Sequence, residues 1–450
     1  MTRSRRGWAA ALTSGLLALV AAVPAGAQPA AAGPSAADPT HAVAAAAPGV
    51  AQHPEYWFPQ WDIPQIWAGG ATGQGVTVAV IDTGVQASVS DLSGSVVSGT
   101  DLTGLGGNGH TDRDRNRFDH GTAMAGLIAG HGGRYLAGVA PSSKILPVAV
   151  PLVGTNQGEH SPDYIADAVR YAAMHGAEVI SMSLGGLRYP GEDGVACPAG
   201  TQDAIYYALS KGAIVVAAGG NSGLKDSPTE EPGVCLGVIA VAAVDAQRHA
   251  PDFSSRHAYL TVAAPGVDVP TINAADAIFI GDGTSQATAL TSGALALIWS
   301  AHPNETNRQV TARLIAGVRD AGPRGVDSTF GYGTINPAAS ISLRLGSNSP
   351  NPVFTRADPF LTTRGPAVAA ALPKPAAAKV GPPAAFVTAA PTEVGVARTL
   401  WLGVAVGAAG VLVLLALLLT RRRRAAAPVW PPSPGFAPPG FPPPQYVPPG

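Results

Sequence analysis

Short segments that are almost continuously apolar alternate, through the middle of the chain, with longer segments of helical periodicity. The apolar segments are residues 76–81, 145–150, 178–184, 213–218, 238–244 and 260–264, and the helical ones are 120–130, 162–175, 201–211, 284–302 and 305–316. Strands that are apolar on both faces are typical of a parallel sheet covered by helices. The pattern therefore predicts an α/β fold in three layers, with a central, mostly parallel sheet.

The predicted domain spans residues 56–345 and begins with an arm that we expect to pack onto the core. Five aromatic residues lie within positions 56–67 of this arm. Ligands of parallel sheets bind at the carboxyl ends of the strands. Polar residues that directly follow a strand are therefore the first candidates for chemistry.

The amino-terminal end of the chain differs from this domain. Residues 1–27 contain three arginines, then an apolar run over 8–23, then Ala-Gly-Ala, which together predict a secretory signal peptide. Ordinary export is favoured over the twin-arginine route, which Arg5-Arg6 only loosely resembles. Residues 28–55 are rich in alanine and proline and bury too little apolar surface to fold, so they are predicted to be disordered.

The carboxyl-terminal end predicts a membrane anchor. Residues 346–397 are rich in proline and alanine and predict an extended linker. Residues 398–420 contain an uncharged apolar run long enough to span about 30 Å of hydrocarbon as one transmembrane helix. Four arginines follow at once, so the basic, proline-rich tail 421–450 should stay in the cytoplasm and the folded domain on the extracytoplasmic side of the cell membrane.

Composition and residue spacing limit which ligands the protein can bind. The formal net charge is −1, and no basic stripe lies outside the termini, which argues against nucleic-acid binding.

The two cysteines, Cys197 and Cys235, would most simply form one disulfide in an exported protein, with two buried thiols as the alternative. Asp112 opens a run that resembles the start of a calcium loop but lacks its glycine and glutamate, so a solvated loop is expected. No histidine or cysteine spacing indicates zinc, and we predict no metal and no cofactor.

Three polar residues stand where elements begin or end. Asp82 ends the first apolar segment, His120 opens a helix of small residues, and Ser285 follows Gly283 and opens a helix that is apolar on every side. Taken singly, His120 could be structural and Ser285 could be a helix cap. At one edge of a sheet, however, an acid, a base and a hydroxyl can form a nucleophilic site.

The order Asp82, His120, Ser285, with the sequence blocks 80–85, 120–130 and 283–287 around them, resembles the subtilisin-like serine proteases. The resemblance covers about residues 60–342. It implies a subtilisin-like fold and a serine endopeptidase that acts on proteins or peptides. Ser285 would be the nucleophile, His120 the general base, and Asp82 the residue that orients the imidazole.

The same resemblance assigns further residues. Asn221 would be the oxyanion-hole amide, although a turn residue is the alternative. Ser183, Leu184 and Gly185 would form the backbone edge that binds an extended peptide.

The serine block departs from the family pattern. Gln286 and Ala289 stand where the family usually has methionine and proline. Because proline is tolerated in the first turn of a helix, its absence should reduce rigidity more than chemistry.

The whole layout, from signal peptide to anchor, resembles the mycosins, which are membrane-anchored subtilases associated with bacterial type VII secretion. Cys197 and Cys235 lie at positions that resemble a mycosin disulfide. This resemblance implies a protease of exported proteins that associates with the type VII secretion membrane complex. The alternative, favoured by the altered serine block and the anchor, is a structural subunit that stabilises a secretion complex with secondary or no proteolysis.

Overall fold

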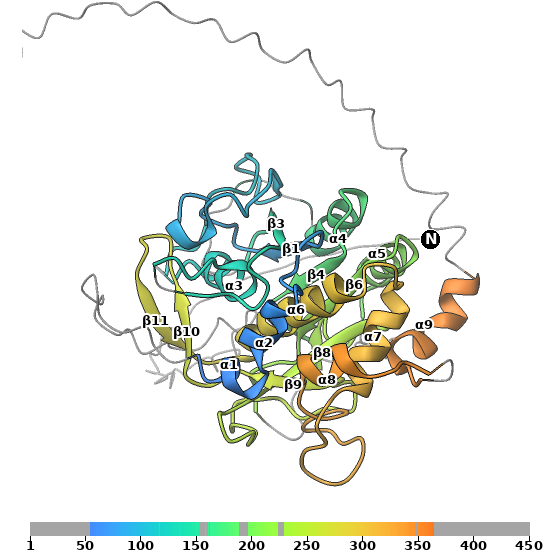
Figure 1. Ribbon diagram of the computed structural model, residues 1–450. Coiled ribbons are helices and arrows are strands. Elements are labelled where there is room, and N and C mark those ends of the chain that lie inside the picture. Colours follow the sequence, from blue (N-terminus) through green and yellow to red (C-terminus); the bar gives the residue numbers. More distant parts are fainter. Residues whose placement is uncertain are drawn as a thin grey trace, which may run out of the picture. The chain divides into compact units, whose positions relative to one another are not determined.

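A parallel sheet of seven strands forms the centre of the folded chain (Figure 1). The computed structural model describes residues 55–363 except 117, 135, 153–157, 159–160, 162, 189–196, 224–228 and 347–348. In spatial order the strands are β2 (Thr100–Asp101), β3 (Lys144–Ala149), β1 (Thr77–Asp82), β4 (Val179–Met182), β6 (Ile214–Ala218), β8 (Val238–Val244) and β9 (Val262–Pro265). Every neighbouring pair is parallel. The predicted α/β fold with a central parallel sheet is therefore confirmed.

The strand order reverses beside β1. The chain passes from β1 through β2 to β3 on one side, and then crosses to β4 on the other. The carboxyl ends of β1 and β4 therefore flank a topological switch point, which is where open α/β sheets bind their ligands. Asp82 ends β1, and Ser183 directly follows β4.

Helices cover both faces of this sheet (Figure 1). Helices α3 and α6 pack together on one face, and α4 and α5 pack together on the other. The helices are α1 (Trp57–Gln60), α2 (Ile63–Ala68), α3 (His120–Ala129), α4 (Tyr164–Met174), α5 (Ala199–Ser210), α6 (Thr284–Ala301), α7 (Asn307–Ala316), α8 (Pro337–Ser342) and α9 (Pro352–Thr363). The five helices and six strands that the pattern predicts are all present, to within two residues at each end.

Helix α6 runs through the core. Every residue from Thr284 to Trp299 is buried. The hydroxyl groups of Thr288, Thr291 and Ser292 each donate to a backbone carbonyl four residues earlier in the helix. These buried hydroxyls are therefore satisfied by the helix itself, which allows an apolar environment on every side.

Smaller elements escape the sequence pattern. Strand β5 (Gly186–Arg188) pairs with β7 (Thr229–Glu231), and β10 (Val269–Ile272) pairs with β11 (Ile278–Gly281), both antiparallel. The 3₁₀ turn η1 (Ser90–Leu92) lies between β1 and β2. These short antiparallel elements lie outside the alternation of buried strands and helices on which the prediction rests.

The aromatic arm, helices α1 and α2, packs onto the core. Trp57 and Ile63 are completely buried. Tyr56 Oη and Trp67 Nε1 each donate to a backbone carbonyl of the domain, both at 3.0 Å. Burial of aromatic rings together with these hydrogen bonds therefore attaches the arm to the domain.

Glu55, at the start of the arm, should make stability depend on pH. Its Oε1 accepts a hydrogen bond from Ala137 N at 3.0 Å. Burial raises the pKa of Glu55 from 4.5 to about 7, opposed by that hydrogen bond and reinforced by the charge of Asp91. A carboxyl group with a raised folded-state pKa stabilises the fold while protonated, and this contribution is lost as pH rises through about 7.

Glu55→Gln removes the ionisable group and keeps an oxygen acceptor. We expect thermal unfolding to show a larger stabilisation by this substitution at pH 8 than at pH 5. A stabilisation that is equal at the two pH values would contradict this assignment.

The structure corrects the predicted linker at its beginning. Helix α9 occupies residues 352–363, within the segment expected to be extended. Val353, Phe354 and Ala357 form its buried face, and the ring of Phe360 stacks on that of Tyr206 in α5. The prediction is wrong here because Pro352 opens the helix, where a missing N–H costs no hydrogen bond.

No helix among the described residues of 55–363 is long and apolar enough to cross a membrane. The predicted signal peptide, the disordered segment as far as residue 54, the rest of the linker, the transmembrane helix and the tail lie outside the described residues.

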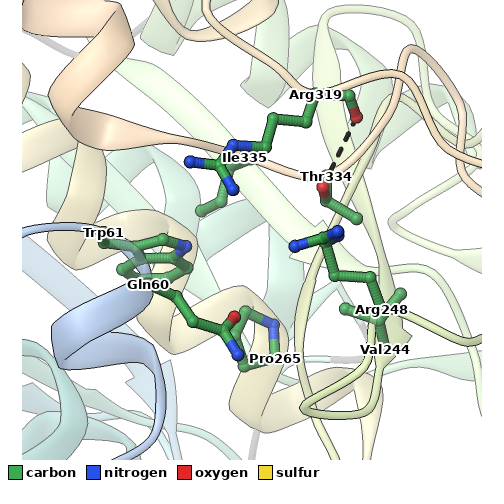
Figure 2. A pocket seen from close by; sticks show the side chains of 8 residues that line it. All are labelled: Gln60, Trp61, Val244, Arg248, Pro265, Arg319, Thr334 and Ile335. Carbon is green, nitrogen blue, oxygen red and sulfur yellow. Dashed lines mark hydrogen bonds between the residues drawn. The ribbon is translucent and has the colours of Figure 1, made fainter.

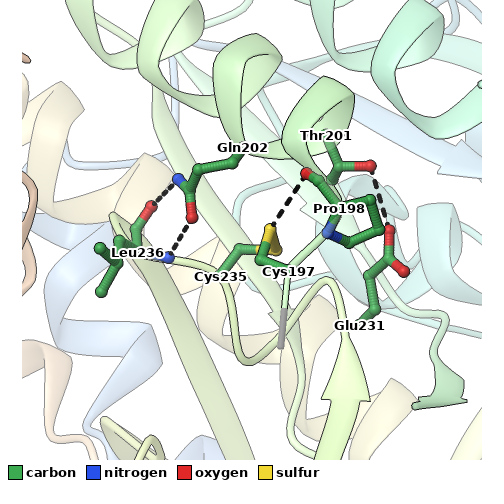
Figure 3. Close-up of a disulfide and its surroundings, with 7 residues drawn as sticks. All are labelled: Cys197, Pro198, Thr201, Gln202, Glu231, Cys235 and Leu236. Carbon is green, nitrogen blue, oxygen red and sulfur yellow. Dashed lines mark hydrogen bonds between the residues drawn. A yellow bond between two sulfur atoms is a disulfide. The ribbon is translucent and has the colours of Figure 1, made fainter. Parts of the chain in front are cut away.

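Cys197 and Cys235 form a disulfide (Figure 3). It joins the chain just before α5 to the turn that follows β7. Gln202 of α5 adds two hydrogen bonds to the backbone of Leu236, and Thr201 Oγ1 donates to Glu231. The disulfide therefore fastens α5 to the segment that carries β7.

Removing this disulfide should destabilise the domain. The cysteines are 38 residues apart, a loop for which chain entropy predicts about 4 kcal/mol of stabilisation. We expect the double substitution C197S/C235S to lower the free energy of unfolding by about 2–4 kcal/mol in denaturant titrations. Wild type under reducing conditions should match the variant, and an unchanged midpoint in both would contradict the prediction.

Candidate active site

Asp82 and His120 meet at the switch point of the sheet. Asp82 is completely buried at the end of β1, and His120 is the first residue of α3. Asp82 Oδ1 accepts hydrogen bonds from His120 Nδ1 at 2.8 Å and from Thr83 N at 2.7 Å. His120 Nε2 is buried without a hydrogen-bond partner in the described chain. The bond to Asp82 thus holds the proton on Nδ1 and leaves the Nε2 lone pair available to accept one.

The surroundings of His120 favour its charged form. Burial alone would lower the pKa of this imidazole, because it removes water from the imidazolium. The negative charge of Asp82 and its hydrogen bond, with the charges of Asp114 and Asp112, outweigh burial and raise the pKa of His120. An imidazolium formed during a reaction would therefore be stabilised at this position.

The carboxylate of Asp112 holds the start of α3 in place. Asp112 accepts hydrogen bonds from Thr83 Oγ1, Thr122 N and Thr122 Oγ1, and Thr83 Oγ1 in turn accepts from Gly121 N. Burial raises the pKa of Asp112 to about 6, against the opposing effect of these hydrogen bonds. The prediction of a solvated loop is therefore wrong at Asp112, which fastens the end of β1 to the first turn of α3.

Ser285 lies at the start of α6 and is 5% exposed. Its Oγ donates to Ser183 O at 3.0 Å, and Ser183 Oγ donates to Ser285 O at 2.9 Å. These bonds join the helix to the carboxyl end of β4, the strand next to β1. Within the described chain no hydrogen bond joins Ser285 to His120. The structure thus brings Asp82 and His120 into contact and holds Ser285 on the adjacent strand end.

Asn221 is oriented by the residue before the serine. Its Oδ1 accepts hydrogen bonds from Thr284 N and Thr284 Oγ1, each at 2.9 Å. Since the oxygen already has two donors, Nδ2 is the end of the amide with hydrogens to offer. This nitrogen lies beside Gly283, where an added Cβ would approach it to 3.4 Å. The amide donor therefore faces the turn that leads into Ser285.

The other predicted residues surround this arrangement. Ser183 is buried, while Leu184 and Gly185 are half-buried. Gln286 is buried with its Oε1 lacking a hydrogen-bond partner among the described residues. Ala289 is completely buried inside α6, where alanine continues the helix without interruption.

One pocket lies away from these residues, beside the arm (Figure 2). Figure 2 shows two arginines, Arg248 and Arg319, reaching toward Trp61 and Gln60. The remaining lining residues are Val244, Pro265, Thr334 and Ile335. Its volume of about 10 Å³ is roughly the space that one water molecule needs. It is too small for a peptide side chain and contains none of the predicted site residues.

No group of histidine, cysteine, aspartate and glutamate side chains suited to hold a metal ion occurs in the part of the chain that the structure describes. The side chains gathered at the switch point are an acid, a base, a hydroxyl and an amide donor. This set belongs to the class of α/β hydrolytic enzymes that use a serine nucleophile.

The chain belongs to the subtilase family, which residues 73–333 match. A thermophilic serine proteinase from Bacillus sp. (strain AK1) is 36% identical over 286 residues, covering 63% of this chain and 64% of that protein. The chain thus spans just under two thirds of that relative's length. Subtilisin from Bacillus pumilus is 35% identical over 296 residues, covering 64% of this chain and 99% of that protein.

Solved structures show the same fold. MycP1 from Mycobacterium smegmatis matches with a TM-score of 0.57 at 26% identity, covering 71% of this chain and 93% of that one. The MycP3 protease from the type VII (ESX-3) secretion system matches with a TM-score of 0.54 at 28% identity, covering 70% of this chain and 94% of that one.

Proposed function

We propose that this protein is a serine endopeptidase in which Asp82, His120 and Ser285 act as a catalytic triad. The observation that carries the proposal is the 2.8 Å hydrogen bond from His120 Nδ1 to Asp82, with Nε2 left without a partner in the described chain. Membership of the subtilase family and relatives that are serine proteases support it.

The reaction begins with a change in the hydrogen bond of Ser285. Its Oγ leaves Ser183 O and donates to His120 Nε2, a contact that often forms fully only with substrate bound. As Oγ attacks the carbonyl carbon of the peptide, its proton passes to Nε2. The resulting imidazolium is stabilised by the charge of Asp82, the same interaction that raises the pKa of His120.

The carbonyl oxygen becomes an oxyanion during this attack. Asn221 Nδ2 and the N–H of Ser285, at the start of α6, are the donors nearest that oxygen in the proposed complex. Collapse of the intermediate breaks the C–N bond, and His120 returns the proton to the leaving amine. Water then attacks the acyl-serine while His120 takes its proton, and His120 returns a proton to Ser285 Oγ as the acid product leaves.

Asn221→Ala should reduce kcat by about 10²–10³-fold with little change in KM, because the lost donor acts on charge that develops in the transition state. Steady-state kinetics on a peptide substrate would measure this. Thr284→Val, which removes one of the two donors that orient Asn221, should show a smaller loss of kcat. Equal losses in both variants would mean that Asn221 acts only by holding the turn.

Labelling with a fluorophosphonate tests the proposal directly. The reagent should modify the folded protein at Ser285, located by mass spectrometry of the digested adduct, and Ser285→Ala should abolish labelling. Folded protein that stays unlabelled at this residue would refute a nucleophilic role.

We further propose that the enzyme is anchored in the cell membrane, faces the extracytoplasmic side, and cleaves exported proteins in association with type VII secretion. Support comes from the predicted signal peptide and apolar carboxyl-terminal run, and from the similarity to MycP3, named for such a system. Protease added to intact cells should digest the domain but spare the tail. Recovery of the domain in the soluble cytoplasmic fraction would contradict this location.

A structural role in a secretion complex is the second candidate. It is favoured by the hydrogen bond that ties Ser285 Oγ to Ser183 O, and by Gln286 and Ala289 in the serine block. The two candidates differ in what Ser285→Ala does in cells. Secretion that survives this substitution but fails when the whole protein is deleted would establish the structural role.

A further inference from the structure

Glu230 is a buried carboxylate beside the proposed active site that has no part in the triad. It lies at the centre of β7 and is 3% exposed. No lysine, arginine or histidine of the described chain forms an ion pair with it. A buried carboxylate without a counter-charge is costly, so its position calls for an explanation.

The carboxylate lies between the two segments that flank the serine. An added Cβ at Gly185, after β4, would lie 2.6 Å from Glu230 Oε2, and one at Gly220, after β6, would clash with Oε1. Strands β4 and β6 are neighbours in the sheet. Because both flanking residues are glycines, the carboxylate lies directly against the backbone of the two segments, and neither glycine places a side chain over it.

Neutral groups hold the carboxylate in place. Glu230 Oε1 accepts from Asn221 N at 3.1 Å, and the hydroxyl of Ser222 provides a further hydrogen bond. Pairing of Glu230 with Leu187 across β5 and β7 fixes the backbone. Burial raises the pKa of Glu230, with these hydrogen bonds opposing the rise. None of these partners carries a positive charge, so no counter-charge for Glu230 is found among the side chains that the structure describes.

A bound peptide would bring one particular side chain to this place. If the proposed reaction is correct, the scissile carbonyl lies between Ser285 Oγ and Asn221 Nδ2. The side chain of the residue that supplies this carbonyl then enters between the segments at 183–185 and 219–221, toward Glu230. A cation there would meet a carboxylate that is already desolvated and already oriented.

We infer that Glu230 is a specificity-determining residue that selects lysine or arginine on the amino-terminal side of the cleaved bond. The inference rests on the proposed function and adds the class of substrate. An ion pair in a desolvated site should favour a cationic side chain over an uncharged one of similar length by about 100-fold in kcat/KM.

The test uses peptides that differ only at the residue before the cleaved bond, which is lysine, arginine, norleucine or glutamate. Wild type should cleave the lysine and arginine peptides about 100-fold faster in kcat/KM than the norleucine peptide. Glu230→Gln keeps the oxygen acceptor for Asn221 N and removes the charge, so it should bring this ratio close to one. Glu231→Gln is the matched control, since Glu231 accepts a hydrogen bond from Thr201, and it should keep the wild-type ratio.

Each outcome decides the inference. The inference is overturned if wild type cleaves the norleucine and lysine peptides with equal kcat/KM. It is also overturned if Glu230→Gln keeps the preference for lysine. If that variant does not fold, the wild-type series alone decides, together with inhibition by lysine and norleucine peptide aldehydes. Labelling at Ser285 separates the two proposals: labelled enzyme without a cationic preference refutes only the role of Glu230, whereas no labelling and no cleavage refute both.

Discussion

Replacing Ser285 by alanine should leave a folded protein whose kcat for peptide hydrolysis is about 10⁶-fold lower, the order expected when a triad nucleophile is lost. The substitution removes only Oγ, whose hydrogen-bond partner among the described residues is Ser183 O. KM should change little, since the binding surface is intact. Activity would be measured with an internally quenched peptide at high enzyme concentration.

The midpoint of thermal unfolding shows whether the Ser285→Ala variant keeps the native fold. The midpoint should stay within a few degrees of wild type, because alanine suits a buried helix. Ser183→Ala is the matched substitution: it removes the reciprocal hydrogen bond to Ser285 O but keeps the nucleophile. A Ser285→Ala protein that folds and retains more than a few per cent of wild-type kcat would refute the triad.

Asp82→Asn should lower kcat/KM by about 10⁴-fold at neutral pH and move the acid limb of the pH profile to lower pH. The rate falls because an asparagine can donate to Nδ1 and favour the wrong tautomer of His120. The limb moves because the charge of Asp82 is a main cause of the raised pKa, and without it burial lowers the pKa. His120 acts as a base only when neutral, so a lower pKa extends activity toward acid.

Asp114→Asn is a control that separates the effect of a nearby negative charge on His120 from the effect of the hydrogen bond to Asp82. The charge of Asp114 also raises the pKa of His120, although in the described chain the imidazole is hydrogen-bonded to Asp82 and not to Asp114. This variant should shift the acid limb in the same direction by a smaller amount and keep the plateau rate. An acid limb that stays in place in Asp82→Asn would contradict the assignment of that limb to His120.

The main sheet and its large helices follow directly from the sequence because burial on both faces leaves a strong signal. Strands such as β8 are apolar at every position, and α6 is buried on every side. The position of α9 could not be predicted in this way. Its proline-rich composition suggests a linker, and only the folded chain shows that the segment has partners to pack against, such as Tyr206 beside Phe360 and Arg308 beside Phe354.

The sequence singles out the proposed site residues because each stands at an element boundary. Asp82, His120 and Ser285 end or begin elements whose ends meet at one edge of a parallel sheet. Asp112 and Glu230 escape such reasoning, since nothing local distinguishes a carboxylate held by the fold from a solvated one. Their roles depend on partners that are distant in sequence, and only the folded chain brings those partners together.

Helix α6 both carries Ser285, the proposed nucleophile, and fills the interior, and this sets limits on how the enzyme can be redesigned. Almost any replacement along its first five turns would disturb packing as well as chemistry, so attempts to retune substrate choice there should yield insoluble protein. In the described chain, the segments after β4 and β6 are hydrogen-bonded to this helix only at its first two residues, Thr284 and Ser285, and strand β7 pairs with β5 instead. Directed evolution of new cleavage preferences should therefore accumulate changes in those peripheral segments and leave the central helix untouched.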